Sequence, residues 1–149
     1  MASRRRAREY ALQALYQSDL AKASVPDALS GLWTGQLEGD DHDELSKRAA
    51  DSEEIEFATR LARGVEEIRP QLDKRIEASS TNWRVSRMSI VDRNILRLGT
   101  FELVHCEDIP ANVSINEAVE LAKRFGTKDS RGFVNGILDR IARDAGRVV

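Results

Sequence analysis

The sequence predicts an all-α protein. Apolar residues recur with a period of about 3.6 in several segments, which is the spacing of one helix face. Only three prolines and nine glycines interrupt the 149 residues, of which 41% are hydrophobic and 32% are charged. This composition is ordinary for a water-soluble helical protein, and the length suffices for one domain with a buried core.

The composition also excludes several classes of protein. No apolar run approaches the ~18 residues that a membrane-spanning helix needs, and the arginine-rich N-terminus lacks the apolar stretch of a signal peptide. We therefore expect a cytoplasmic protein without membrane contact. Cys106 is the only cysteine, so no intramolecular disulfide can form. With two histidines beside it, the chain offers too few ligands for a structural zinc site.

Charge is distributed unevenly along the chain. The net charge is −2, which alone argues against binding to nucleic acid. Residues 1–22, however, hold five basic and two acidic side chains, a net of +3. Residues 38–56 hold nine acidic and two basic side chains, a net of −7. Because local charge decides where a polyanion binds, the N-terminal segment is the better candidate.

The first predicted helix begins after Ser3, a suitable N-cap, and covers RRRAREYALQALYQ. Positive charge at a helix N-terminus opposes the helix dipole, so an arginine run there suggests a use in binding. Arginine can hold phosphate, the amide of Gln13 can pair with base edges, and the ring of Tyr16 can stack on a base of RNA. The alternative is a solvated arginine run with Tyr16 in the core. The arginines of this run are Arg4, Arg5, Arg6 and Arg8.

The middle of the chain is predicted from breaks in the apolar pattern. Residues 25–33 are predicted as a short helix with a proline in its first turn, and the acidic stretch 35–52 as a polar loop. Residues 53–69 carry a long buried stripe and are predicted as a helix, followed by a shorter one around Leu72. Trp83 is then expected to anchor the following turn in the core.

A further helix is predicted to begin at Ser89, which has Asp92 three residues later as a capping pattern. Arg93 and Arg97 are one turn apart, so both could face outward together. They could supply a basic groove for single-stranded RNA if this helix lies beside the first. The alternative is a pair of ordinary surface charges. The candidate core residues of this helix are Val91, Ile95, Leu98 and Leu103.

The stretch from Asn112 to Ile141 is predicted as two helices joined by a tight polar turn. Ser114 and Glu117 form a capping-box pattern, so the first helix should begin at Ile115. Gly126 occupies the place where a left-handed residue commonly ends a helix.

The second helix of this stretch is expected to be capped by Asp129 or Ser130. Gly132 and Gly136 lie on one of its faces, although glycine costs up to about 1 kcal/mol inside a helix. Something must therefore approach the backbone there, either a neighbouring helix or a nucleic acid or partner chain. Its inner face is expected to hold Phe133, Ile137 and Ile141, with Val134 and Leu138 beside them.

No enzyme motif occurs in the sequence. The glycine-containing segments lack the lysine-serine ending of a phosphate-binding loop, and no HExxH, CxxC or GxSxG pattern is found. His42 and His105 have no evident nucleophile to activate. We therefore expect a protein that is not an enzyme and that needs no cofactor or metal.

Three segments resemble the NusB family of bacterial transcription antitermination factors: RRRAREYALQALYQ, DRNILRLGTFEL and NVSINEAVELAKRFGTKDSRGFVNGILDRI. Their order and spacing also fit, and the resemblance runs from Ser3 to about Ile141. The closing segment is the most specific of the three. The resemblance implies about seven helices in two small bundles packed together. We expect one RNA-binding domain over residues 1–149, with halves at 1–78 and 79–149.

The resemblance also implies a function without catalysis. Members of the family bind the single-stranded boxA element of nascent RNA together with NusE, a ribosomal protein of the small subunit. They act within a complex on RNA polymerase that suppresses premature termination, notably in ribosomal RNA operons. Some members self-associate, so a homodimer is possible. We expect the same RNA and protein partners for this chain.

The resemblance assigns roles to single residues. The arginine run, Gln13 and Tyr16 match positions that face RNA, and Phe133 matches a phenylalanine that can lie close to RNA. Phe101 stands where many members carry tyrosine, so a hydroxyl is missing there. The predicted RNA-binding residues are Arg4, Arg5, Arg6, Arg8, Gln13, Tyr16, Arg93, Arg97 and Phe133. The predicted partner-binding residues are Asp92, Phe101, Glu102 and Asp129.

Two other functions stay open from the sequence. The same helical module occurs at the front of ribosomal RNA cytosine methyltransferases, so the chain could assist ribosomal RNA modification, with catalysis in a separate chain. It could also be a helical adaptor that binds only proteins. A methyl-transfer assay tests the first function, and binding of boxA-like against scrambled RNA tests the second.

Overall fold

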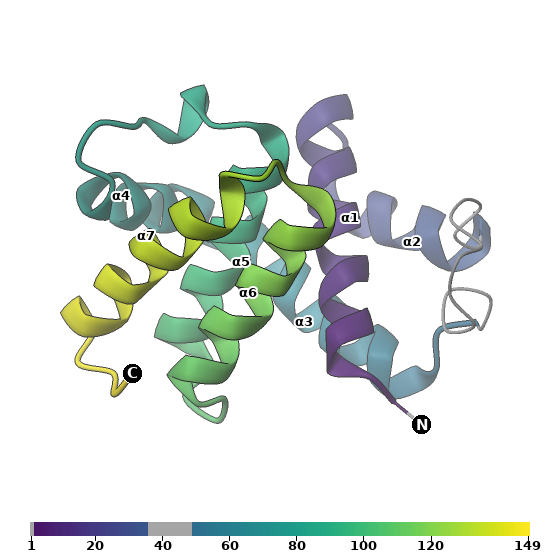
Figure 1. Ribbon diagram of the computed structural model, residues 1–149. Helices are drawn as coiled ribbons and strands as arrows, with labels where there is room; N and C mark the ends of the chain where they lie inside the picture. The colour runs from purple at the N-terminus through teal and green to yellow at the C-terminus, as the bar shows by residue number, and fades with distance from the viewer. Residues whose placement is uncertain (1, 36–48) are drawn as a thin grey trace. The chain divides into compact units, whose positions relative to one another are not determined.

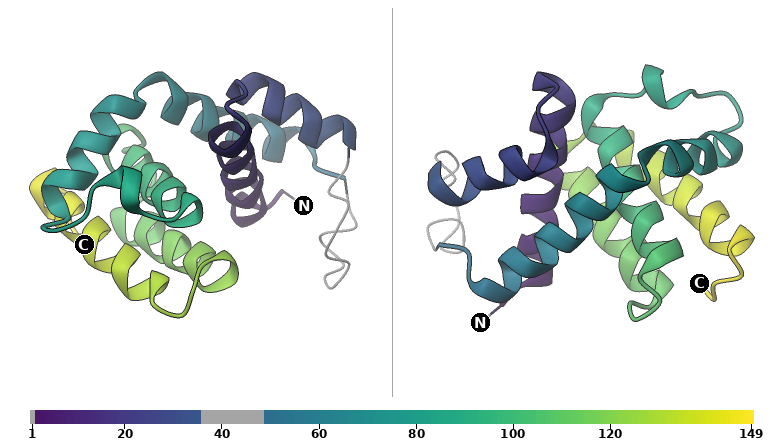
Figure 2. Two further views of the ribbon diagram at one scale, coloured as in Figure 1. Left: turned by 90° about the horizontal axis from the view of Figure 1, so that it is seen from above. Right: turned by 180° about the vertical axis from the view of Figure 1, so that it is seen from behind.

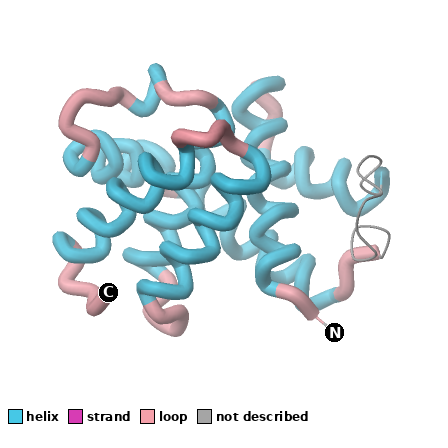
Figure 3. Tube along the Cα trace, viewed as in Figure 1, coloured by secondary structure: helices cyan, strands magenta, loops and turns pink. Residues whose placement is uncertain are grey.

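A computed structural model describes residues 2–35 and 49–149 of the chain. Over these ranges it contains seven α-helices, one short 3₁₀ helix and no strand (Figures 1 and 3). The predicted all-α class is confirmed. Most of the loop predicted at 35–52 lies outside the described residues. None of the described helices combines the length and the apolar character that crossing a membrane requires.

The helices divide between two compact units, residues 1–63 and residues 64–149, called here unit 1 and unit 2. The elements are α1 (Arg4–Ala21), α2 (Val25–Gly35), α3 (Ser52–Glu67), α4 (Arg69–Ser79), η1 (Val85–Arg87), α5 (Ile90–His105), α6 (Ala111–Phe125) and α7 (Ser130–Asp144). The division between the units falls inside α3, and α4, which packs against α5 and α7, belongs to unit 2.

Unit 1 is built on the pairing of α1 with α2. The Ser3 hydroxyl accepts a hydrogen bond from the Arg6 amide at 3.1 Å, so the predicted N-cap of α1 is confirmed. The Tyr10 and Trp33 rings meet edge to face at 5.1 Å and join the two helices. One face of α1 carries small residues and is fully buried, namely Ala7, Ala11 and Ala14.

Unit 2 is a bundle in which α5, α6 and α7 all pack against one another, with α4 against α5 and α7 (Figure 2). Gly99 allows α5 and α7 to approach closely, because a Cβ atom there would lie 2.6 Å from a methyl carbon of Leu138. Ser89 caps α5 as predicted, and its hydroxyl accepts from the Asp92 amide at 3.0 Å. Of the core residues predicted for α5, Val91 is half-buried, and Ile95, Leu98 and Leu103 are buried.

Two predictions about α6 are wrong. The helix begins at Ala111 rather than Ile115, because the buried Ser114 hydroxyl donates to Glu102 at 2.9 Å instead of capping. Gly126 has a φ of −94° and is not left-handed. Its missing side chain makes room for Ser130, whose hydroxyl would lie 2.5 Å from a Cβ atom at this position.

The start and inner face of α7 match the prediction only in part. Asp129 occupies the N-cap position, but its side chain makes no capping hydrogen bond. The Ser130 hydroxyl accepts from the Thr127 amide at 3.0 Å and so closes the preceding turn. Phe133 is half-buried. The other predicted inner residues are buried as expected, namely Val134, Ile137, Leu138 and Ile141.

Candidate nucleic-acid interface

The arginine run at the start of α1 is only partly accessible. Arg4 and Arg5 are exposed. Arg6 and Arg8 expose only 6% and 3% of their surface, so two of the four predicted RNA-binding arginines are buried. The reason is that unit 1 uses two of these side chains for its own packing.

Arg6 lies beside a buried carboxylate that belongs to the start of α3. Its guanidinium is 3.9 Å from Glu54, which is 1% exposed, and it also covers the Tyr10 ring at 5.1 Å. Glu54 accepts hydrogen bonds from the Ser3 amide at 2.8 Å and from the Asp51 amide at 3.2 Å. It therefore ties the beginning of α1 to the beginning of α3.

The role of Glu54 was not predicted from the sequence, although a local signal is present. The Glu54 amide donates to the Asp51 carboxylate at 2.9 Å, and the Glu54 carboxylate in turn accepts from the Asp51 amide. This is the reciprocal arrangement of a capping box, and its spacing is visible in the sequence as D-x-x-E. The contact with Arg6 has no comparable local signature.

Arg4 and Arg8 lie over the same aromatic ring. Their guanidinium carbons are 4.5 Å and 5.3 Å from the centroid of Phe57, which is itself buried. A pocket of about 450 Å³ opens beside this ring, and Glu53, Glu54 and Glu56 line it together with Arg4 and Arg60. Because carboxylates repel phosphate and outnumber the cations here, we do not place an RNA path inside this pocket.

The outer side of α1 holds the remaining predicted residues of unit 1. Gln13 is exposed and Tyr16 is half-buried. At 3.6 residues per turn, Arg5, Gln13 and Tyr16 lie within about 80° of one another around the helix axis. The structure therefore places an arginine, an amide and a phenol ring along one accessible side of α1.

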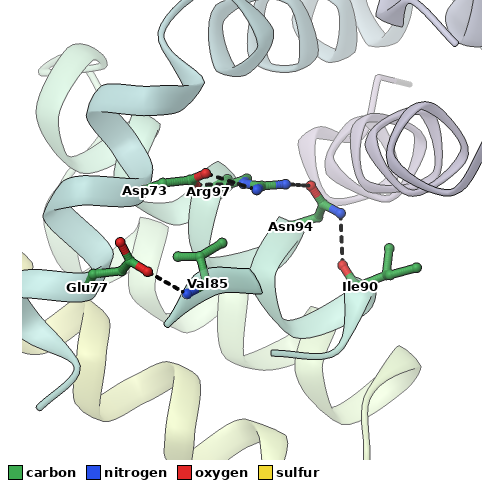
Figure 4. Close-up of polar contacts among 6 residues, drawn as sticks. All are labelled: Asp73, Glu77, Val85, Ile90, Asn94 and Arg97. Carbon is green, nitrogen blue, oxygen red and sulfur yellow. Dashed lines mark hydrogen bonds and ion pairs between the residues drawn. The ribbon is translucent and has the colours of Figure 1, made fainter. Parts of the chain in front are cut away.

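Arg97 is an internal residue of unit 2, so the prediction that it faces outward with Arg93 is wrong. It is 6% exposed, and its guanidinium binds both carboxylate oxygens of Asp73, at 2.8 and 3.0 Å (Figure 4). It also donates to the Asn94 amide oxygen at 3.1 Å. The bidentate geometry holds α5 to α4. Arg93 is half-buried.

The four predicted partner-binding residues also divide into buried and accessible ones. Glu102 is 2% exposed and receives the Ser114 hydrogen bond, so it joins α5 to α6 inside the unit. Phe101 and Asp92 are half-buried, and Asp129 is exposed. The Phe101 ring lies against Gly64, where a Cβ atom would come within 2.2 Å of it. Only Glu102 is removed from contact with solvent.

An exposed aromatic pair lies on unit 2. Trp83 is 53% exposed, so its predicted place in the core is wrong. Its ring meets Phe133 edge to face, with centroids 6.1 Å apart. Gly132 and Gly136 are exposed, and among the described residues no heavy atom other than those of the local helix backbone and the adjoining residues lies within 4 Å of a Cβ atom built on either. A neighbouring helix therefore does not explain these two glycines.

Comparison with known proteins decides the family. The model of the NusB family matches residues 5–143. The chain belongs to the NusB family. The transcription antitermination protein NusB of Myxococcus xanthus (strain DK1622) is 50% identical over 142 residues, which cover 95% of this chain and 96% of the relative.

Solved NusB structures share the fold. NusB of T. maritima is 39% identical with a TM-score of 0.82, over 97% of this chain and 94% of that one. A chain from a crystal structure of the antitermination factors NusB and NusE in complex with dsRNA is 24% identical with a TM-score of 0.80, over 95% and 96%. The predicted NusB-like arrangement of about seven helices is thereby confirmed.

Proposed function

We propose that this NusB-family chain is a cytoplasmic antitermination factor that binds boxA-type single-stranded RNA in nascent ribosomal transcripts. It does so together with the ribosomal protein NusE, within a complex that keeps RNA polymerase from terminating early. The observation that carries the proposal is the family match over residues 5–143. A relative of the same fold has been crystallised with NusE and dsRNA, which names the two classes of partner.

The RNA contacts proposed for unit 1 are those that internal packing leaves accessible. Arg4 and Arg5 supply positive charge for phosphates at the start of α1. Gln13 and Tyr16 supply hydrogen bonds and a stacking surface further along the same helix. Arg6 and Arg8 act on RNA only indirectly, because they fix the helix start from which their neighbours project.

The contacts proposed for unit 2 are Phe133, whose ring is half-buried, and Arg93. Arg97 is left out, because its guanidinium is bound to Asp73. A single-stranded RNA is recognised mainly by stacking and by phosphate contacts, and these two residues supply one group of each kind.

The NusE surface is proposed to include Asp92, Phe101 and Asp129. Carboxylates repel RNA phosphates, so acidic residues at the surface favour a basic protein as the partner. Phe101 adds an accessible aromatic ring, which is the type of residue that anchors interfaces. Glu102 supports this surface from inside through its bond to Ser114.

The test is RNA binding with and without NusE. Fluorescence anisotropy of a labelled boxA-like RNA and of a scrambled RNA is measured at several salt concentrations. We expect the boxA-like RNA to bind more tightly, NusE to raise that affinity, and log affinity to fall linearly with log salt concentration. Equal binding of both RNAs in the presence of NusE would rule out boxA recognition, and no binding of either RNA would favour a protein adaptor.

A further inference from the structure

Trp83 is a large aromatic side chain that the fold holds in place but does not bury. Its ring is 53% exposed, although burying a tryptophan stabilises a protein more than burying almost any other side chain. Its backbone is fixed, because its amide donates to the Ser80 carbonyl at 3.1 Å and its carbonyl accepts from the Ser80 hydroxyl at 3.0 Å. The ring is therefore presented to solvent from a defined position.

The segment around Trp83 is anchored at both sides. On one side the Arg140 guanidinium of α7 donates to the Ser79 carbonyl at 3.0 Å. On the other, the Glu77 carboxylate of α4 accepts from the amide of the buried Val85 at 2.9 Å (Figure 4). The connection between α4 and α5 contains little regular secondary structure (Figure 3). These side-chain hydrogen bonds hold it in position instead. Preorganised groups lose less entropy when they bind a ligand.

The surface beside Trp83 is accessible to an extended ligand. Phe133 contacts the tryptophan ring, and Phe133, Gly136 and Arg140 are spaced to lie along one side of α7. Gly136 carries no side chain and has open space above it. A ligand stacked on the two rings can therefore approach the helix backbone.

Charge at this surface favours an anionic occupant. The segment 79–89 contains Arg84 and Arg87, both exposed, and no acidic residue. Among the carboxylates of α4 and α7, Glu77 accepts from the Val85 amide, and Asp139 pairs with Arg143 at 2.9 Å. Aromatic rings flanked by cations are what single-stranded nucleic acid needs, because bases stack and phosphates are neutralised.

We propose that Trp83 is a base-stacking residue, and that single-stranded RNA runs from Phe133 across Trp83 toward Arg84 and Arg87. This inference rests on the RNA-binding function proposed above. It adds a second stacking platform and two phosphate contacts to that function.

The two tryptophans of the chain, Trp33 and Trp83, allow a direct test. In Trp33→Phe protein the fluorescence comes from Trp83, and in Trp83→Phe protein it comes from Trp33. Each variant is titrated with a boxA-like single-stranded RNA in the presence of NusE. We expect quenching in the Trp33→Phe variant and an unchanged signal in the Trp83→Phe variant. Absence of quenching in the Trp33→Phe variant while RNA binds would overturn the inference.

Affinity measurements supply the second arm. Trp83→Ala should weaken RNA binding roughly 5- to 150-fold, whereas Trp83→Phe, which keeps a ring, should lose much less. Phe125→Ala removes another exposed ring of unit 2 and is the matched control, with affinity close to wild type. Arg84→Ala and Arg87→Ala should each flatten the log–log salt dependence by about 0.7.

The outcomes separate this inference from the function on which it rests. If wild-type and Trp83→Ala proteins bind RNA equally, Trp83 is not a contact, and the proposed function stands. If Trp83→Ala lowers NusE affinity but leaves RNA affinity unchanged, the surface is a protein-binding one and the inference is wrong. If the wild-type protein binds no RNA even with NusE, both proposals fail.

Discussion

The start of α1 and the surface around Trp83 contain the same residue types in opposite arrangements. In unit 1 the rings of Tyr10 and Phe57 are buried, and arginines lie over them. In unit 2 the Trp83 ring is exposed, and the neighbouring arginines extend into solvent. An arginine run is therefore a poor guide to an RNA site by itself. An RNA site depends on which cations and aromatic rings stay accessible to solvent after internal packing.

The difference follows from how much core each unit can build. Unit 1 contains α1, α2 and part of α3, so little apolar surface is available to cover its rings. Arginine covers a ring well, since its stem is apolar and its planar head stacks on the aromatic face. Unit 2 has three mutually packed helices with α4 against two of them, and its core forms without Trp83.

The largest effect expected from this comparison concerns Glu54. Glu54→Gln leaves the buried Arg6 guanidinium without this counter-charge, so the free energy of unfolding should fall by about 3–5 kcal/mol. Urea denaturation followed by circular dichroism measures the change. Glu53→Gln alters an exposed neighbour in the same turn and should change stability by less than about 0.5 kcal/mol. Similar values for both variants would show that the arginines of α1 are not structural.

The same replacement, glycine to alanine, tests the packing of unit 2 at two positions. Gly64→Ala should destabilise the protein by about 1–3 kcal/mol, because the new methyl group would overlap the Phe101 ring. Gly136→Ala should stabilise it by up to about 1 kcal/mol, since alanine favours the helix and the space is open. Thermal unfolding should show a lower melting temperature for Gly64→Ala and a higher one for Gly136→Ala.

The same Gly136→Ala variant also tests the proposed RNA path on unit 2. A methyl group on the bare side of α7 should weaken RNA binding even though the fold becomes more stable. Full RNA affinity in the stabilised variant would remove Gly136 from the proposed path. It would leave the open glycine without a functional explanation.

A pair of arginines separates packing from binding within α1. Arg5→Ala should weaken RNA binding and flatten the log–log salt dependence by about 0.7, with an unchanged melting temperature. Arg8→Ala should lower stability by about 1 kcal/mol or more, because a buried arginine over Phe57 is lost. Anisotropy titrations and thermal melts on both variants check this. A loss of salt dependence in Arg8→Ala protein alone would reverse the two assignments.

Local patterns predicted the helices well, because the forces that start and align them act within a few residues. Ser3 and Ser89 cap α1 and α5 as their spacing indicated. The failures arise where a distant residue takes over a polar group. Arg97 binds a carboxylate 24 positions earlier in the chain. The Ser114 hydroxyl is drawn to Glu102 instead of capping a helix.

The candidate site was harder to predict than the fold for the same reason. Whether an arginine is free to bind RNA depends on its tertiary partners, and single-residue propensities do not contain that information. Trp83 shows the opposite error: tryptophan is usually buried, so its exposure could not be foreseen from its type. The resemblance to a family identified the helices concerned but did not separate Arg5 from Arg6.

Asp129 provides the smallest and most specific test. It stands at the start of α7 as the arginines stand at the start of α1, but its charge has the sign that favours a helix N-terminus. Its side chain is exposed and makes no capping hydrogen bond. Asp129→Asn should therefore change stability by less than about 0.5 kcal/mol.

The effect of Asp129→Asn should appear in partner binding instead. An exposed carboxylate at the rim of an interface acts mainly through long-range attraction, so the substitution should slow association with NusE at low salt and matter less at moderate salt. RNA binding without NusE should be unchanged or slightly stronger, since one repulsive charge is gone. Association rates of NusE at two salt concentrations measure this, with Asp144→Asn, an exposed aspartate at the other end of α7, as control. If both variants associate as the wild type does at either salt concentration, Asp129 lies outside the NusE surface, and the acidic side of that surface must be sought around Asp92.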